Sequence, residues 1–178
     1  VTGNLISIGS AGNGGGKGIR VDDSNITPSD ININGNIIDV YNAYGGIALF
    51  QGIKSRVFEN IVTLHVPDVN YYGIGVFNNQ SARVQCNTVI GSSSTSGSIQ
   101  RGFIFSKSFN SSVTCNVESN TKFGFEFDDL CDATNFQENT MSTNWSGLYL
   151  NGNGVIGAQD VAGIKWDCIS GFGSGYEG

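Results

Sequence analysis

Apolar and polar residues alternate in short segments along most of this chain, and the segments recur in a shared order. In each recurrence a glycine precedes an apolar-x-apolar strand, and a later short strand leads into an asparagine. The clearest copy is Gly46-Ile47-Ala48-Leu49 followed by Arg56 to Leu64. Alternation with a period of two predicts β-strands with one buried face, because successive side chains of a strand point to opposite sides. We therefore predict an all-β chain.

The spacing of the glycines and asparagines indicates a repeat. The step from glycine to asparagine is 14 residues from 46 to 60, from 73 to 87 and from 102 to 116, and 15 residues from 124 to 139. The step from asparagine to the next glycine varies between 8 residues (116 to 124) and 15 residues (87 to 102). Each unit thus has a fixed half and a loop-bearing half. A period in the twenties, built from strands alone, is typical of a solenoid whose repeats bury their apolar faces against one another.

The repeat predicts which side chains face the interior on the strand after each loop-bearing half. Its inward positions are all apolar: Ile19 and Val21, Ile47 and Leu49, Ile74 and Val76, Phe103 and Phe105, Phe125 and Phe127, Leu148 and Leu150. The intervening positions should point outward: Arg20, Ala48, Gly75, Ile104, Glu126 and Tyr149, then Asp22, Phe50, Phe77, Ser106, Asp128 and Asn151.

Residues 3 to 150 resemble the right-handed parallel β-helix family, which includes pectate lyases, polygalacturonases, phage tailspikes and bacterial surface proteins. In that family an inward asparagine at one bend of each coil stacks on its counterparts. Five residues match this ladder: Asn36, Asn60, Asn87, Asn116 and Asn139. Amides at a tight turn satisfy local backbone groups and bond along the stack at the strand spacing of about 4.8 Å. The resemblance implies about six coils over residues 1–150, with 151–178 an irregular extension or the start of the next segment.

Charge and hydropathy exclude two classes of partner. Nine lysines and arginines against fifteen acidic residues give a formal net charge of −6. Phosphate backbones are bound by basic stripes, so nucleic acid is not expected. Arg56 and Arg83 occupy equivalent positions and should stack on the outside, but two arginines are not a stripe. No segment has the 18 apolar residues of a membrane span, so membrane insertion is not expected either.

The four cysteines leave the redox state open. Cys86 and Cys115 each precede a ladder asparagine and should stack with Cα atoms about 4.8 Å apart, which permits a disulfide. Stacked side chains in a ladder are more often free buried thiols, and we favour that interpretation. Cys131 and Cys168 lie in the loop-rich last third and are the better candidates for a pair.

Three motifs suggest cofactors but fit poorly. The glycine-rich segment 9–18 lacks the first glycine and the final Ser or Thr of a phosphate-binding loop, since Ala11 and Gly18 stand there. His65, the only histidine, has no second histidine or cysteine nearby in the sequence, so we expect no metal site. Calcium at Asp22, Asp23 and Asp30 is reasonable chemistry, but loop aspartates are ordinarily hydrated. We predict no resident cofactor.

The best catalytic candidates are Asp128 and Asp129, with Glu126 nearby. The segment 128–131, Asp-Asp-Leu-Cys, resembles the Asp-Asp-Cys segment of polygalacturonases, where inverting hydrolysis needs two carboxyl groups about 6.5–9.5 Å apart. The family's third aspartate, one coil earlier, and its Gly-His-Gly, one coil later, are both missing here. A turn therefore explains the aspartates better than catalysis does, and the clustered aspartates and arginine of a pectate lyase are absent too.

Two hypotheses about function remain. In the first, the chain is a structural or adhesive β-helix segment of a secreted or cell-surface fibre, in contact with neighbouring segments, identical subunits or a cell-surface glycan. In the second, it is a polysaccharide lyase, glycoside hydrolase or carbohydrate-binding module, with Glu126, Asp128, Asp129 and the 91–98 loop forming a cleft. Phe50 and Phe77 should stack outward and could bind sugar rings, but exposed apolar patches more often mark protein contacts, which favours the first hypothesis.

The two ends of the chain suggest a larger parent. Val1 begins inside what reads as a coil, and we expect the chain to be a piece of a longer protein or to be capped by neighbours. Residues 151–166 resemble the tails of β-helix regions in very large secreted Bacteroidota proteins that are exported by the type IX system. The resemblance implies a secreted or cell-surface location.

Overall fold

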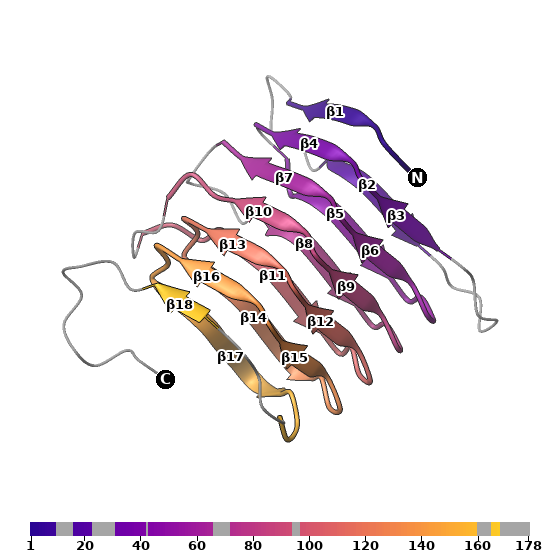
Figure 1. Cartoon of the computed structure of the whole chain (residues 1–178), viewed down its shortest axis with the longest axis vertical. Helices are drawn as coiled ribbons and strands as arrows, with labels where there is room; N and C mark the ends of the chain where they lie inside the picture. Colours follow the sequence, from indigo (N-terminus) through magenta and orange to yellow (C-terminus); the bar gives the residue numbers. More distant parts are fainter. Residues whose placement is uncertain are drawn as a thin grey trace.

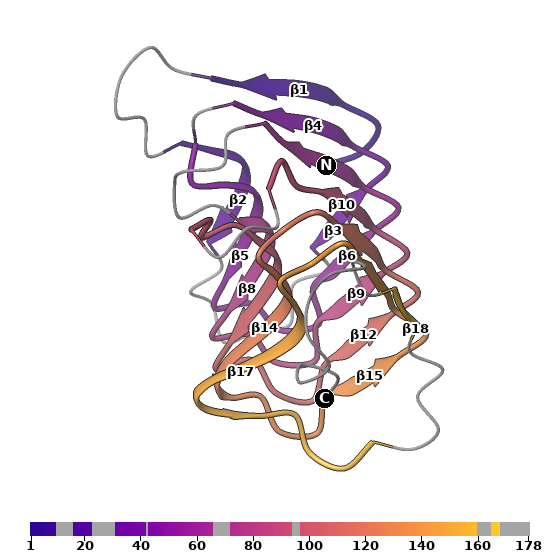
Figure 2. The ribbon, with the colours of Figure 1, turned by 90° about the vertical axis from the view of Figure 1, so that its left-hand side faces the viewer.

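The computed structural model describes residues 1–9, 16–22, 31–41, 43–65, 72–93, 97–159 and 165–167. Eighteen strands and no helix occur among them. The strands form three parallel sheets that wind around one core, with β1 at one end of the stack and β17 and β18 at the other (Figures 1 and 2). The chain is therefore a parallel β-helix, as predicted. No helix in the described residues is long and apolar enough to cross a membrane.

Each sheet collects one strand from each coil. Sheet C takes the strand that follows the glycine, sheet A the short strand before the asparagine, and sheet B the strand after it. Sheet C contains β2 (Lys17–Asp22), β5 (Gly45–Phe50), β8 (Tyr72–Phe77), β11 (Arg101–Ser106), β14 (Phe123–Leu130) and β17 (Ser146–Val155). Sheet A contains β3 (Asn32–Asn34), β6 (Arg56–Phe58), β9 (Arg83–Gln85), β12 (Ser112–Thr114) and β15 (Asn135–Gln137). Sheet B contains β1 (Leu5–Ile8), β4 (Ile37–Val40), β7 (Ile61–Leu64), β10 (Thr88–Ile90), β13 (Val117–Ser119), β16 (Thr140–Ser142) and β18 (Lys165–Asp167).

The solenoid has fewer complete turns than the six predicted. Because sheet A has only five strands, only five turns carry all three strands among the described residues. Residue 150, where the repeat was predicted to end, lies inside β17, and β18 adds a further strand to sheet B. The register between β14 and β17 shifts between Asp128 and Leu130, so the pairing of these two strands is irregular at that point.

The interior is mainly apolar and changes character along the axis. The inward side chains of β5 and β8 are aliphatic, whereas those of β11 and β14 are phenylalanines that stack in register. The rings of Phe103 and Phe125 lie 4.5 Å apart, those of Phe105 and Phe127 lie 5.0 Å apart, and Phe136 meets Phe125 and Phe127 edge-on. These rings are fully buried, and they follow the alternation that the sequence predicts.

The repeated glycine of sheet C is required by close packing. A Cβ atom on Gly73 would lie 2.4 Å from Val89 Cγ1 of sheet B and 2.8 Å from the carbonyl oxygen of Gly102 in the next coil. Gly46 is in the same position against Val62, and Gly102 against Glu118. The glycine lets sheets B and C approach, because any side chain would overlap these atoms.

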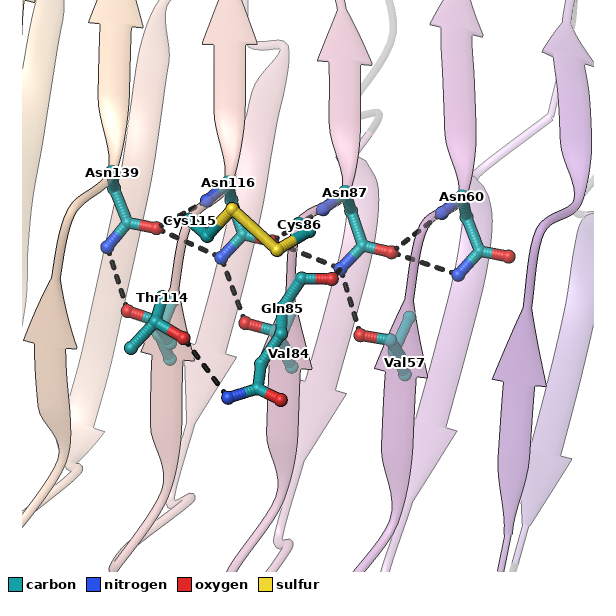
Figure 3. Close-up of a disulfide and its surroundings, with 11 residues drawn as sticks. Val57, Asn60, Val84, Gln85, Cys86, Asn87, Thr114, Cys115, Asn116 and Asn139 are labelled. Atoms are coloured by element: carbon teal, nitrogen blue, oxygen red, sulfur yellow. Dashed lines mark hydrogen bonds between the residues drawn. A yellow bond between two sulfur atoms is a disulfide. The ribbon is translucent and has the colours of Figure 1, made fainter.

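The asparagine ladder is present and every predicted rung is buried. Each ladder Oδ1 accepts hydrogen bonds from the backbone N–H and the Nδ2 of the asparagine one coil earlier, at 2.8–3.0 Å for Asn36 to Asn60. The same bonds measure 2.9–3.0 Å for Asn60 to Asn87, which Figure 3 shows. The remaining Nδ2 hydrogen of Asn87 reaches the carbonyl oxygens of Val57 and Gln85. Asn4 adds a rung that the sequence analysis did not count, since its Nδ2 donates to Asn36 Oδ1 at 2.9 Å.

The residue before each ladder asparagine has a left-handed backbone, with φ between 52° and 64°. These residues are Gly3, Gly35, Glu59, Cys86, Cys115 and Glu138. This conformation makes the sharp bend between sheets A and B and lets the next side chain enter the core. It leaves the side chain before the asparagine outside: Cys86 and Cys115 are exposed.

Cys86 and Cys115 form a disulfide between adjacent coils, with Cα atoms 4.5 Å apart (Figure 3). The expectation of free buried thiols is therefore wrong. The physical reason is the left-handed turn, which directs both side chains outward, where nothing separates the two sulfur atoms. Cys131 is a free thiol buried in the core, and burial raises its pKa. Cys168, its suggested partner, lies outside the described residues.

Candidate functional site

The outer face of sheet C carries the residues that the sequence analysis singled out. Its outward residues form three columns across the strands. From first to last along each strand, these columns are Gly45–Tyr72–Arg101–Phe123, Ala48–Gly75–Ile104–Glu126 and Phe50–Phe77–Ser106–Asp128. The middle column was predicted to point outward, and three of its residues, Ala48, Gly75 and Glu126, are nevertheless buried. A Cβ on Gly75 would lie 2.5 Å from the ring of Phe77 and 2.7 Å from that of Tyr72. Aromatic rings from the flanking columns fold over the middle one.

The first aromatic cluster on this face contains Phe50, Phe77 and Tyr72. The rings of Phe50 and Phe77 stack at 4.9 Å, and Tyr72 meets Phe77 edge-on at 5.5 Å. The guanidinium of Arg20 lies 4.9 Å from the Phe50 ring centre, within the range of a cation–π contact. Burial raises the pKa of Tyr72 to about 12, with a smaller opposing effect of Arg20. The cluster is half-buried, cationic at one edge and apolar on its outer side.

The second aromatic cluster contains Phe123 and Tyr149, whose rings stack at 4.3 Å. Arg101 and Lys122 lie 6.0 and 5.1 Å from the Phe123 ring centre. Beside these rings Glu126 forms an ion pair with Arg101 and accepts a hydrogen bond from Asn151 Nδ2 at 3.2 Å. Only 1% of the Glu126 side chain is exposed. Its carboxylate is thus neutralised by a neighbour, as buried charges usually are.

The two candidate aspartates have separate partners. Asp128 accepts a hydrogen bond from Ser106 Oγ at 3.3 Å, one strand away on the same face. Asp129 has a left-handed backbone (φ 62°), and its carboxylate lies 3.5 Å from Lys107 Nζ. The strand bends at Asp129, so its side chain belongs to the turn and not to the column that holds Glu126 and Asp128. Part of the 91–98 loop, residues 94–96, lies outside the described residues.

A buried polar cluster of Glu118, Thr121 and Asn144 lies in the core between sheets B and C. It was not predicted from the sequence, and we call it the Glu118 cluster. Glu118 occupies the inward position of β13, in register with Val89 and Met141, and is fully buried. Its Oε1 lies 2.6 Å from Thr121 Oγ1 and its Oε2 accepts from Asn144 Nδ2 at 2.5 Å. Burial raises the pKa of Glu118 to about 8, against smaller opposing effects of Thr121 and Asn144. The period-two alternation of β13 could have placed it inside.

A protonated Glu118 accounts for the hydrogen bonds between Glu118 and Thr121. Its proton can be donated to Thr121 Oγ1, and the Thr121 hydroxyl then donates to the carbonyl oxygen of Phe123 at 2.8 Å. Asn144 donates to the other Glu118 oxygen. A neutral acid therefore completes a short hydrogen-bonded chain, whereas a carboxylate would be a buried charge with no cationic partner in the cluster.

The remaining candidates have ordinary surroundings. His65 Nε2 lies 2.9 Å from Asp39 Oδ1, and its ring stacks on Tyr41 at 4.2 Å. Asp22 pairs with Arg20 at 2.9 Å, while Asp23 and Asp30, the other proposed calcium ligands, lie outside the described residues. Within the described ranges, three or more His, Cys, Asp or Glu side chains do not gather in a metal-binding arrangement.

Comparison with known proteins adds no relative: no protein-family model matches the chain, and neither a curated protein nor a solved structure is significantly similar to it.

Proposed function

We propose that this chain is a structural or adhesive β-helix segment of a secreted or cell-surface fibre or appendage, which mediates assembly or attachment. The observation that carries the proposal is the unbroken stack: one apolar core and one asparagine ladder run through consecutive coils. A solenoid of this kind is a stiff rod, because each coil is fixed by its neighbours on both sides.

The disulfide between Cys86 and Cys115 supports a secreted or surface location. Both cysteines are exposed, so a reducing cytoplasm would have access to the bond. Disulfides persist mainly in oxidising compartments. Peptide mapping by mass spectrometry of the natural protein, alkylated without reduction, tests this: the proposal expects Cys86 and Cys115 to stay linked, and free alkylation of both of these cysteines would count against secretion.

The origin that we propose follows the resemblance of residues 151–166. The proposed parent is a very large Bacteroidota protein that is exported by the type IX system. In this proposal the chain is one segment of that protein and has a pectin-lyase-like fold. The resemblance lies in the local sequence pattern of these residues. Residues 160–164 lie outside the described part of the structure. Genomic context and the length of the natural open reading frame test it directly.

The contact surface that we propose for assembly is the aromatic cluster of Phe50, Phe77 and Tyr72. Its stacked rings are half-buried within one chain and would be covered further by a neighbouring segment or an identical subunit. Sedimentation velocity is the appropriate measurement. The double variant Phe50→Ser and Phe77→Ser should shift the protein toward monomer, whereas Phe109→Ser, an exposed aromatic residue elsewhere, should not. Identical sedimentation of all three proteins would remove this surface from the proposal.

A second function, a carbohydrate-active enzyme or carbohydrate-binding module of pectin-lyase-like type, is favoured by one observation. The stacked pair Phe123 and Tyr149 lies on the same outer face as Glu126 and Asp128, and aromatic rings beside carboxylates suit sugars. Cleavage of an acidic polysaccharide that is lost on Asp128→Asn would establish the enzyme and overturn the structural proposal. Unchanged cleavage by Asp128→Asn would point to a contaminant.

A further inference from the structure

The outer face of sheet A contains two adjoining hollows. The larger, of about 550 Å³, is lined by Lys54, Arg56, Ser81, Ala82, Arg83, Asn110, Ser111, Ser112, Ala133 and Asn135. The smaller, of about 270 Å³, is lined by Arg56, Phe58, Glu59, Arg83, Gln85 and Cys86. Arg56 and Arg83 line both hollows, so their side chains lie where the two meet. We call the two together the sheet A groove.

Among the described residues, the cationic side chains of this groove form no ion pair. Arg56 and Arg83 are directly opposite each other in the parallel register of β6 and β9, which puts two like charges about one strand spacing apart at their backbones. Like charges in this arrangement are destabilising. None of the ion pairs in the described residues includes Arg56, Arg83 or Lys54, and all three are exposed. Three of the chain's nine cationic side chains thus gather in one place on a protein of net charge −6.

The rest of the larger hollow is polar and uncharged. Hydroxyl and amide groups come from Ser81, Ser112, Asn110 and Asn135, and its described lining residues include no carboxylate. Asn110 Nδ2 donates to Ser81 Oγ at 3.0 Å, which orders the rim. In the smaller hollow Phe58 offers an apolar ring face, and Glu59 is the single acidic residue. Hydroxyl-binding groups beside paired guanidinium groups suit a ligand with both hydroxyls and an oxyanion.

We propose that the sheet A groove binds an acidic glycan, with a sulfate or carboxylate group held between Arg56 and Arg83. Guanidinium groups bind such oxyanions through two parallel N–H···O bonds. The Ser and Asn rim receives the ring hydroxyls, and Phe58 covers an apolar sugar face. An extended nucleic acid is disfavoured because the surrounding protein is acidic and the cationic cluster is small. The inference is independent of assembly through sheet C, since it concerns a different sheet, and no catalysis is involved.

The test is binding of oligosaccharides to the folded protein by isothermal titration calorimetry. A sulfated dextran oligomer tests for a sulfate ligand, and a polyuronate oligomer tests for a carboxylate ligand. Neutral dextran tests whether the sugar binds without an oxyanion. The proposal expects binding of at least one acidic oligomer, loss of that binding as salt rises, and none of neutral dextran. A single-stranded DNA oligomer that bound as tightly as the best glycan would overturn it.

Variants of matched charge locate the site. Arg56→Gln with Arg83→Gln should weaken binding at least about tenfold, since hydrogen bonds to charged groups contribute about 1.5–3 kcal/mol each. Arg20→Gln with Lys107→Gln removes the same charge from exposed positions elsewhere and should change affinity less than about twofold by screening. The single Arg83→Lys variant keeps the charge and removes the planar fork, so a loss there identifies bidentate contact. Equal losses in the two double variants, or none in either, would overturn the groove as the site.

Discussion

The asparagine ladder and the Glu118 cluster both bury polar side chains, and they satisfy them in different ways. In the ladder, each asparagine bonds to an identical asparagine in the next coil. In the core between sheets B and C, Glu118 lies in a column of otherwise apolar residues. It forms hydrogen bonds with Thr121 of its own coil and Asn144 of the next. Repetition makes the ladder cooperative along the axis, whereas the Glu118 cluster depends on one proton.

Removing one central rung should break the ladder most severely. In Asn87→Ala the Asn60 backbone N–H and Nδ2 lose their shared acceptor, and the Val57 and Gln85 carbonyls lose a donor. Because these groups are buried, we expect a loss of about 3–5 kcal/mol in the free energy of unfolding, measured by chemical denaturation. The terminal rung is the matched control: Asn4→Ala should cost less than about 1 kcal/mol, since Asn4 is exposed. Equal losses at both positions would mean that the ladder is not cooperative.

The Glu118 cluster should make stability fall as pH rises. The folded pKa of about 8 lies above the value of 4.5 for a free glutamate, so the unfolded chain ionises first. The free energy of unfolding should decrease from about pH 4.5 to about pH 8 by at most about 1.4 kcal/mol per pH unit from this group, then level off.

Glu118→Gln is the matched variant for this prediction, because its amide can donate to Thr121 and accept from Asn144 as the neutral acid does. The difference in stability between variant and natural protein should grow with pH between those limits, with the variant the more stable near pH 8. Parallel stability curves over that range would show that Glu118 is not held neutral.

Two equivalent glycines of sheet C allow a comparison of packing against an apolar residue and against Glu118. Gly73 faces Val89 and Gly102 faces Glu118, with would-be Cβ contacts of 2.4 and 2.2 Å. Substitution of either by alanine should cost about 1–3 kcal/mol from overpacking, visible as a lower thermal midpoint. Gly97→Ala, where a Cβ would meet nothing within 4 Å, should leave the midpoint unchanged. A harmless Gly73→Ala would show that the sheets can separate at little cost.

Much of the fold was predictable because a solenoid repeats one local geometry. The fixed step from glycine to asparagine predicted the order of strands, the inward faces and the five ladder residues. Asn4 carried the same Gly-Asn signal as Asn36 and could have been counted.

Features that depend on neighbouring side chains were not predictable in the same way. The burial of Gly75 depends on how the rings of Tyr72 and Phe77 turn over the sheet. The disulfide was misjudged because the left-handed bend that points the asparagine inward also points the preceding cysteine outward. Likewise, the partners of Glu126 and Asp129 come from residues one strand away, whose rotamers no repeat specifies.

The disulfide has a mechanical consequence for a rod of this kind. It joins two consecutive coils across 29 residues of chain. A tensile load that peels coils apart one after another cannot extend the enclosed segment, so the hydrogen bonds between those coils are shielded and the peeling stops there. Reduction releases that stored length, roughly 100 Å at about 3.3–3.6 Å per residue. The redox state of the surroundings therefore sets how far the rod can stretch before it fails.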